Sequence, residues 1–180
     1  VAIGGKESGL EPEPTTYDEH TQIGPSLLPL AHHPSFFHMD HATSWVRSRK
    51  NDDTPFCLVY SCNEPHPPYT SPEPFHSMFD SDAMDLPPNW KDPAGPALVA
   101  HRKAEQLQVV TDWTEQQMRA MRAAYWGAVT YVDHLVGRLI TALLDAEKWD
   151  NTLFIFFSDH GEMLGHHGLI AKGALMYEDL

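Results

Sequence analysis

Hydrophobic positions follow different patterns along the chain, and each pattern predicts a different kind of element. Between residues 115 and 147, apolar side chains recur at intervals of three and four, which is the period of an amphipathic helix. The runs PFCLVYS (55–61) and LFIFFS (153–158) are apolar almost throughout, as in strands buried on both faces of a sheet. Residues 1–36 show no sustained period, which indicates an irregular leading segment.

The helix predicted over residues 115–147 also has a start signal. Thr114 and Gln117 have the T-x-x-Q spacing of a capping box, in which each side chain accepts a hydrogen bond from the other residue's backbone N–H. Asp133 and His134 are expected on its polar face. The apolar positions expected on its buried face are Met118, Met121, Tyr125, Ala128, Val132, Leu135, Leu139 and Leu143.

A second, shorter helix is predicted from HMDHATSWVRSRKND, where Met39, Ala42 and Val46 recur at threes and fours. The resulting order of strand, long excursion, helix and strand is that of a βαβ crossover. We therefore expect an α/β fold with a mostly parallel sheet flanked by helices. Residues 37–180 would form part of one domain. The start, VAIGGKESGL, has no initiating Met, which indicates a piece of a longer chain.

Charge and composition narrow the classes of function. The 180 residues include 12 Lys and Arg against 25 Asp and Glu, a formal net charge of -13. This balance argues against a nucleic-acid partner, because such proteins need clustered basic residues to displace counterions from phosphates. An anionic substrate would need a locally positive site, built from a metal ion or a few basic groups. No window reaches the roughly 18 apolar residues of a transmembrane helix.

The two cysteines indicate the redox environment. Cys57 and Cys62 are five residues apart in FCLVYSC, where an extended strand points their side chains to opposite faces, too far apart to pair. Unpaired cysteines favour a reducing compartment, which points to the cytoplasm.

Polar clusters follow both predicted strands. His66 follows the first strand and Asp159-His160 the second, so in a parallel sheet they would open onto the same edge, where ligands bind in open α/β folds. A carboxylate and an imidazole are two ligands for calcium, magnesium or manganese. The alternative is that Asp159 caps a turn and His160 is a surface histidine.

His66 and Lys172 are candidates for contacts to an anionic substrate. His66 lies between Pro65 and Pro67, whose stiff backbone suits a side chain that must meet a substrate. Lys172 is an isolated cation in a stretch rich in glycine and histidine. The alternatives are a histidine at the rim of a rigid turn and an ordinary surface lysine.

These residues belong to a longer pattern. SDHGEMLGHHGLIAKG (158–173), followed by MYED, closely resembles the metal-site and lysine region of the sulfatase family in the alkaline phosphatase superfamily, where S-D-H-G-x-x-L-G-x-H-G recurs. Upstream, PFCLVYSCNEPHPPYTSPEPF (55–75) is similar to the family's apolar strand followed by P-H-P-P-Y, and KWDNTLFIFFSDHG (148–161) to its D-N-T phrase. The resemblance spans roughly residues 36–180.

The resemblance implies a fold of the alkaline-phosphatase and sulfatase type and a role for each matched residue. It makes Asp159 and His160 ligands of a divalent metal ion, calcium first, with manganese or magnesium as alternatives. It makes Lys172 a contact to the sulfate oxygens and His66 a second contact to the sulfate or leaving-group oxygen. His167 matches the histidine of G-x-H-G and would support substrate binding.

The resemblance also implies that the domain of residues 37–180 continues beyond both ends, with parts that these residues do not include. The family's nucleophile is a formylglycine made from the Cys or Ser of a C/S-x-P-S-R motif, and neither Cys57 nor Cys62 lies in one. We therefore expect the nucleophile and the remaining metal ligands upstream, and no activity from these 180 residues alone.

The expected function is that of a sulfatase, a metal-dependent sulfuric ester hydrolase that cleaves sulfate monoesters of small molecules or saccharides. The alternatives are a phosphonate or phosphate monoester hydrolase of the same superfamily and a nonenzymatic binding module that keeps the fold. The Pro-rich segment over residues 70–111 is the expected source of substrate selectivity.

Overall fold

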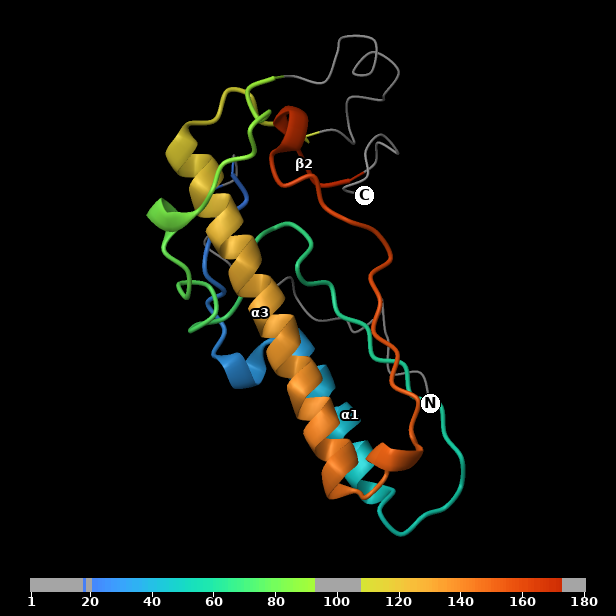
Figure 1. Ribbon diagram of the computed structural model, residues 1–180. Coiled ribbons are helices and arrows are strands. Elements are labelled where there is room, and N and C mark those ends of the chain that lie inside the picture. The colour runs from blue at the N-terminus through green and yellow to red at the C-terminus, as the bar shows by residue number, and fades with distance from the viewer. Residues whose placement is uncertain (1–17, 19–20, 93–107, 173–180) are drawn as a thin grey trace. The chain divides into compact units, whose positions relative to one another are not determined.

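The computed structural model (Figure 1) describes residue 18 and residues 21–92 and 108–172. Most of the leading segment 1–36 that was expected to be irregular lies outside the described residues, as do residues 93–107 of the Pro-rich segment. The chain divides into two compact units, one comprising Val1–Met78 and Ala124–Phe154, the other Phe79–Ala123 and Ile155–Leu180.

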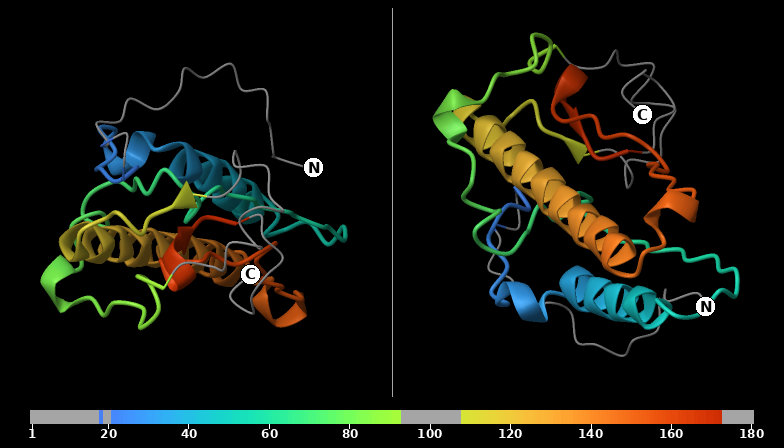
Figure 2. Two further views of the ribbon diagram at one scale, coloured as in Figure 1. Left: turned by 90° about the horizontal axis from the view of Figure 1, so that it is seen from above. Right: turned by 60° about the horizontal axis from the view of Figure 1, so that its bottom comes forward.

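The core of the first unit forms between two helices. Helix α1 spans Pro34–Ser48 and helix α3 spans Glu115–Asp145. Buried side chains of α1 pack against those of the later part of α3. Figures 1 and 2 show α1 lying alongside that part of α3. The buried side chains that join them are Met39, Ala42, Phe75, Tyr131 and Leu135 in one cluster and Val46, Ala142, Leu143 and Ala146 in a second.

The short helix predicted from the sequence is confirmed, with different ends. Its three expected core residues, Met39, Ala42 and Val46, are at most 1% exposed. The helix begins at Pro34, before the predicted segment, because a proline is well suited to the first helical position, where its missing N–H would have no partner.

The long helix and its capping box are also confirmed. The Gln117 backbone N–H donates to Thr114 Oγ1 over 3.2 Å, and the Thr114 backbone N–H donates to Gln117 Oε1 over 2.8 Å. Five of the eight expected core positions are buried, and Tyr125, Val132 and Leu139 are half-buried. The buried Tyr131 was not among the expected positions.

The predicted buried strands are not seen in this form. Over residues 55–61, Phe56, Leu58 and Tyr60 are half-buried while Cys57 and Val59 are exposed, so this run covers the core with one face only. In the second run the exposed fractions are 84% for Leu153, 68% for Ile155 and Phe156 and 78% for Phe157. A strand in a parallel sheet needs hydrogen-bonding neighbours, and neither run forms a ladder among the described residues.

The sheet that the described residues do form is small and antiparallel. Strand β1 (Gln108–Val109) pairs with β2 (Leu169–Ile170), with Gln108 opposite Ile170 and Val109 opposite Leu169. Four 3-10 helices complete the described elements: η1 (Leu30–His32), η2 (Ser81–Ala83), η3 (Trp149–Asn151) and η4 (His166–Gly168). None of the described helices has the length and apolar character needed to cross a membrane.

Candidate active site

The two expected metal ligands lie together in the second unit. Asp159 Oδ2 is 3.6 Å from His160 Nε2, and the Asp159 side chain is 84% exposed while that of His160 is 33% exposed. Two donor atoms this close together can approach one cation, and most of the carboxylate surface is open to further ligands.

Backbone contacts set the tautomer of His160. Its Nδ1 is 2.8 Å from the Gly161 carbonyl oxygen, which can only accept, so Nδ1 carries the proton of the neutral ring. Nε2 then presents its lone pair on the side of Asp159. This is the form in which a histidine binds a metal ion, with the other ring nitrogen held by a carbonyl. The Ser158 hydroxyl donates to the His160 carbonyl over 2.6 Å and braces the same turn.

Backbone conformation and close packing explain why glycine occupies both glycine positions of the following G-x-H-G sequence. Gly165 has a φ of 92° and Gly168 a φ of 68°, both in the left-handed region that side chains disfavour. A Cβ on Gly165 would lie 2.5 Å from the Met118 sulfur, and one on Gly168 would overlap the Thr111 side chain. The backbone N–H of His167 donates to Asn89 Oδ1 over 3.3 Å, and this hydrogen bond connects the loop to residue 89 of the same unit.

Lys172 follows strand β2 in the same unit. It is half-buried, and the residue before it, Ala171, has a φ of 61°. Glu162, which sequence interpretation left without a role, accepts a backbone hydrogen bond from Ala171. The sequence signal for Glu162 was its place inside the S-D-H-G-E motif, three residues after Asp159.

His66 lies in the first unit, in a turn closed by a 2.9 Å hydrogen bond from its backbone N–H to the Asn63 carbonyl. The flanking Glu64-Pro65 and Pro67-Pro68 peptide bonds are cis. The ring is exposed, and its Nδ1 is 2.6 Å from the Pro67 carbonyl oxygen, which again assigns the proton to Nδ1. The ring nitrogen directed to other partners is therefore Nε2.

A buried polar network supports this turn. The Tyr131 hydroxyl is 3.0 Å from His33 Nδ1, and His33 Nε2 is 3.8 Å from Glu64 Oε1. The other Glu64 oxygen accepts from the Ser35 hydroxyl over 2.7 Å, and the Tyr60 hydroxyl donates to the Ser35 carbonyl over 2.9 Å. The network ties Glu64, two residues before His66, to both α1 and α3.

Titratable groups of this network are held in their neutral forms. Burial raises the pKa of both Tyr60 and Tyr131 far above the ordinary range. The next cause is the nearby Cys62 for Tyr60 and the Glu64 carboxylate for Tyr131. Burial and the Glu64 carboxylate raise the pKa of the Cys62 thiol to about 12. Both cysteines are free.

Four of the five expected site residues belong to one unit. Asp159, His160, His167 and Lys172 belong to the second unit, and His66 to the first, so a shared edge with His66 stays a prediction. No group of three or more His, Cys, Asp or Glu side chains suited to a metal ion occurs in the part of the chain that the structure describes. Asp159 and His160 therefore offer two donors, a hard oxygen and an imidazole nitrogen, that fit a divalent cation whose shell is completed elsewhere.

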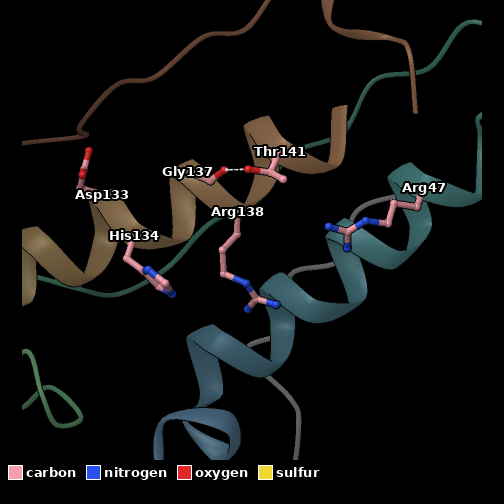
Figure 3. Close-up of a pocket in the computed structure, with 6 residues that line it drawn as sticks. All are labelled: Arg47, Asp133, His134, Gly137, Arg138 and Thr141. Carbon is pink, nitrogen blue, oxygen red and sulfur yellow. Dashed lines mark hydrogen bonds between the residues drawn. The ribbon is translucent and has the colours of Figure 1, made fainter. Parts of the chain in front are cut away.

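Residues of α1 and α3 line a groove (Figure 3). It is lined by Arg47, Asp133, His134, Gly137, Arg138 and Thr141. Asp133 and His134 are exposed, as expected for the polar face of the helix. Arg138 is paired with Asp40, and Arg47 Nε is 3.1 Å from Asp145 Oδ2, so the two guanidinium groups already have carboxylate partners.

Comparisons with known proteins agree with one another. The family model described as Sulfatase matches residues 17–180. The multifunctional alkaline phosphatase superfamily protein PehA of Trinickia caryophylli is 34% identical over 173 residues, which are 86% of this chain and 33% of that protein. An arylsulfatase of Clostridium perfringens is 33% identical over 141 residues, covering 74% of this chain and 29% of that protein.

A solved structure is similar over nearly the whole chain. The phosphonate monoester hydrolase of Agrobacterium radiobacter matches with a TM-score of 0.70 and 28% identity, covering 92% of this chain and 34% of that one. The chain thus spans about a third of the length of the relatives that it matches. The similarity supports an α/β architecture of this type, although the parallel sheet is not seen among the described residues.

Proposed function

Because the chain belongs to the sulfatase family, we propose that the protein is a metal-dependent hydrolase of sulfate monoesters. The observation that carries this proposal is the Asp159-His160 pair, whose donor atoms are 3.6 Å apart within the family's S-D-H-G sequence. Residues 37–180 would be part of the catalytic domain.

Asp159 and His160 would hold the metal ion through a carboxylate oxygen and Nε2. Calcium is the first choice and manganese or magnesium the alternatives, since one oxygen and one nitrogen donor suit all three. When bound, a divalent cation supplies a positive charge that polarises the sulfate ester. In the neutral ring, the hydrogen bond from His160 Nδ1–H to the Gly161 carbonyl leaves Nε2 as the nitrogen with the lone pair for this role.

Lys172 and His66 would contact the substrate itself. The Lys172 ammonium group would neutralise a nonbridging sulfate oxygen, whose charge a protein with a net charge of -13 otherwise repels. His66 in its imidazolium form would donate from Nε2 to a sulfate or leaving-group oxygen, because its Nδ1 proton is directed to Pro67. His167 would support substrate binding.

The nucleophile would be a formylglycine from a C/S-x-P-S-R motif outside these 180 residues. The isolated 180-residue chain is therefore expected to be inactive. Substrate selectivity is assigned to the Pro-rich segment 70–111, and exchanging that segment between relatives should change which sulfate ester is preferred.

The test is hydrolysis of 4-nitrophenyl sulfate by the full-length protein, before and after metal removal with EDTA and readdition of calcium, manganese or magnesium. Asp159→Asn should lower kcat/KM by at least about 100-fold, since it removes a charged metal ligand. Asp133→Asn, an exposed aspartate on α3, is the matched control and should leave kcat/KM unchanged. An Asp159→Asn protein as active as the control would contradict the site assignment.

A second candidate is a phosphonate monoester hydrolase. The observation in its favour is the similarity of 92% of the chain to the Agrobacterium radiobacter enzyme of that name. The same metal pair and lysine suit either tetrahedral anion. A kcat/KM for 4-nitrophenyl phenylphosphonate well above that for 4-nitrophenyl sulfate would favour this candidate.

A nonenzymatic binding module is the alternative from another class. A full-length protein that carries no Cys or Ser in a C/S-x-P-S-R motif, and that hydrolyses neither ester with metal present, would favour it. A mass map that finds the formylglycine peptide would exclude it.

A further inference from the structure

We propose that Glu162 is a positioning residue for Lys172. Its carboxylate connects the loop after the Asp159-His160 pair to the turn that presents the lysine. The inference rests on the proposed role of Lys172 in binding the sulfate group and adds Glu162 as the residue that orients the Lys172 side chain.

The Glu162 carboxylate accepts hydrogen bonds from two separate parts of the backbone. Its Oε1 accepts a hydrogen bond from the backbone N–H of Leu164 over 3.3 Å and a second, short one from the backbone N–H of Ala171. The Met163 backbone N–H donates to the Ala171 carbonyl over 3.2 Å. One carboxylate oxygen therefore bonds two backbone groups that are seven residues apart, and the second belongs to the residue directly before Lys172.

The backbone conformation explains why this bond is needed. Leu164, His167 and Ala171 have φ values of 46°, 53° and 61°, in a region that residues with a Cβ disfavour. Such conformations persist only where surrounding contacts hold them. Because the φ of Ala171 sets the direction in which the chain enters Lys172, losing the bond to its N–H would let Ala171 relax and would redirect the lysine side chain.

A second contact holds the other side of the loop. Arg122 in α3 donates from Nη1 to the Leu164 carbonyl over 3.0 Å, so Leu164 is bonded through both its N–H and its C=O. Glu162 thus links a segment anchored on the helix to the lysine turn. Glu162 Oε1 accepts hydrogen bonds from two backbone N–H groups, whereas the carboxylate of Asp159, the proposed metal ligand, is largely exposed.

The experiment uses the full-length protein and five variants: Glu162→Ala, Glu162→Gln, Glu162→Asp, Lys172→Ala and the double variant Glu162→Ala with Lys172→Ala. The readout is kcat/KM for the better of 4-nitrophenyl sulfate and 4-nitrophenyl phenylphosphonate. We expect Glu162→Ala to lower kcat/KM by roughly 10- to 100-fold, the size of a loss from misplacing a catalytic group by about 1 Å. In the Lys172→Ala background the same change should cost less than about twofold, because the two residues act as one unit.

Two conservative variants separate hydrogen bonding from charge. Glu162→Gln keeps the length and an acceptor oxygen and should stay within about threefold of the wild type, while Glu162→Asp keeps the charge but is one methylene shorter and should lose activity as Glu162→Ala does. If Glu162→Ala fails to fold, the comparison of Glu162→Gln with Glu162→Asp still tests whether Glu162 positions Lys172. Hydrogen exchange of the Ala171 amide should be faster in the aspartate variant than in the glutamine variant, with or without detectable hydrolysis.

Two results would overturn the proposal, and a third would remove its premise. A Glu162→Ala loss as large without Lys172 as with it would mean that Glu162 acts on another group. A glutamine variant as impaired as the alanine variant, with the aspartate variant active, would assign the effect to charge. If the wild type is active and Lys172→Ala is fully active, the premise that Lys172 binds the sulfate group is wrong. That result would contradict the proposed role of Lys172, not the hydrogen bonds made by Glu162.

Discussion

The hydroxyl of Tyr131 in α3 lies 3.0 Å from Nδ1 of His33, the residue that directly precedes α1. The two rings meet edge to face with centroids 5.1 Å apart, and both residues are at most 1% exposed. This contact fastens the start of α1 to the long helix and, through Glu64, to the turn that carries His66.

Tyr131→Phe should lower the free energy of unfolding by about 1–3 kcal/mol, because it leaves a buried imidazole nitrogen without its hydroxyl partner while keeping the ring packing. Urea unfolding followed by circular dichroism measures this. Thr141→Ala, which removes an exposed hydroxyl from the same helix, is the control and should stay within about 0.5 kcal/mol of the wild type. Equal effects of the two changes would contradict the role of the buried bond.

Two glycines of α3 should respond oppositely to the same substitution. Gly127 is buried, and a Cβ there would overlap the Phe75 carbonyl oxygen, whereas a Cβ on Gly137 meets nothing within 4 Å. Gly127→Ala should destabilise by about 1–3 kcal/mol through overpacking. Gly137→Ala should stabilise by about 0.5–1 kcal/mol through helix propensity. Thermal unfolding of both variants tests the pair, and a stabilising Gly127→Ala would be inconsistent with the close approach.

The capping box gives a prediction about the start of α3. Thr114→Ala should cost about 1 kcal/mol, because the Gln117 backbone N–H loses its 3.2 Å bond to the hydroxyl. Thr114→Ser keeps the hydroxyl and should restore most of that loss. Chemical denaturation of both variants provides the measurement, and a serine variant no more stable than the alanine variant would mean that the hydroxyl contributes nothing.

The two cysteines should differ in reactivity. With the pKa of Cys62 raised to about 12 by burial and the Glu64 carboxylate, roughly one thiol in ten thousand is ionised at pH 8, and the thiolate is the reactive form. Iodoacetamide at pH 8 should therefore label the exposed Cys57 well before Cys62, as measured by peptide mass spectrometry. Labelling of Cys62 at the rate of Cys57 would indicate that its surroundings are more open than the structure shows.

His66 and His41 form a matched pair for testing the substrate contact. Both rings are exposed, and each Nδ1 is close to a backbone carbonyl oxygen, at 2.6 Å for His66 and 2.9 Å for His41. His66→Ala should lower kcat/KM for sulfate ester hydrolysis by about 100-fold, the usual loss of one donor to a developing charge. His41→Ala should leave it unchanged, and both melting temperatures should stay near the wild type. Equal kinetics of the two variants would remove His66 from the proposed mechanism.

Local signals were enough to predict the helices. The capping box at Thr114, the three- and four-residue spacing in α3 and the positions of Met39, Ala42 and Val46 in α1 each depend on contacts within one helix or on one helical face. Those patterns are set by the geometry of the helix itself, so the sequence contains them in full. The S-D-H-G sequence likewise determined that Asp159 and His160 are neighbours with complementary donor atoms.

Only the tertiary structure decided how the other segments are used. The apolar runs 55–61 and 153–158 have strand-like composition, but a strand requires hydrogen-bonding partners that its own sequence does not specify, and most of the second run is exposed. Tyr131 is buried because His33 and Phe75 surround it, and Glu162 bonds Ala171 because β2 returns the chain to it. Local periodicity thus determined which segments are helical, whereas contacts between residues distant in the sequence decided which side chains are buried and which backbone groups hold the proposed site.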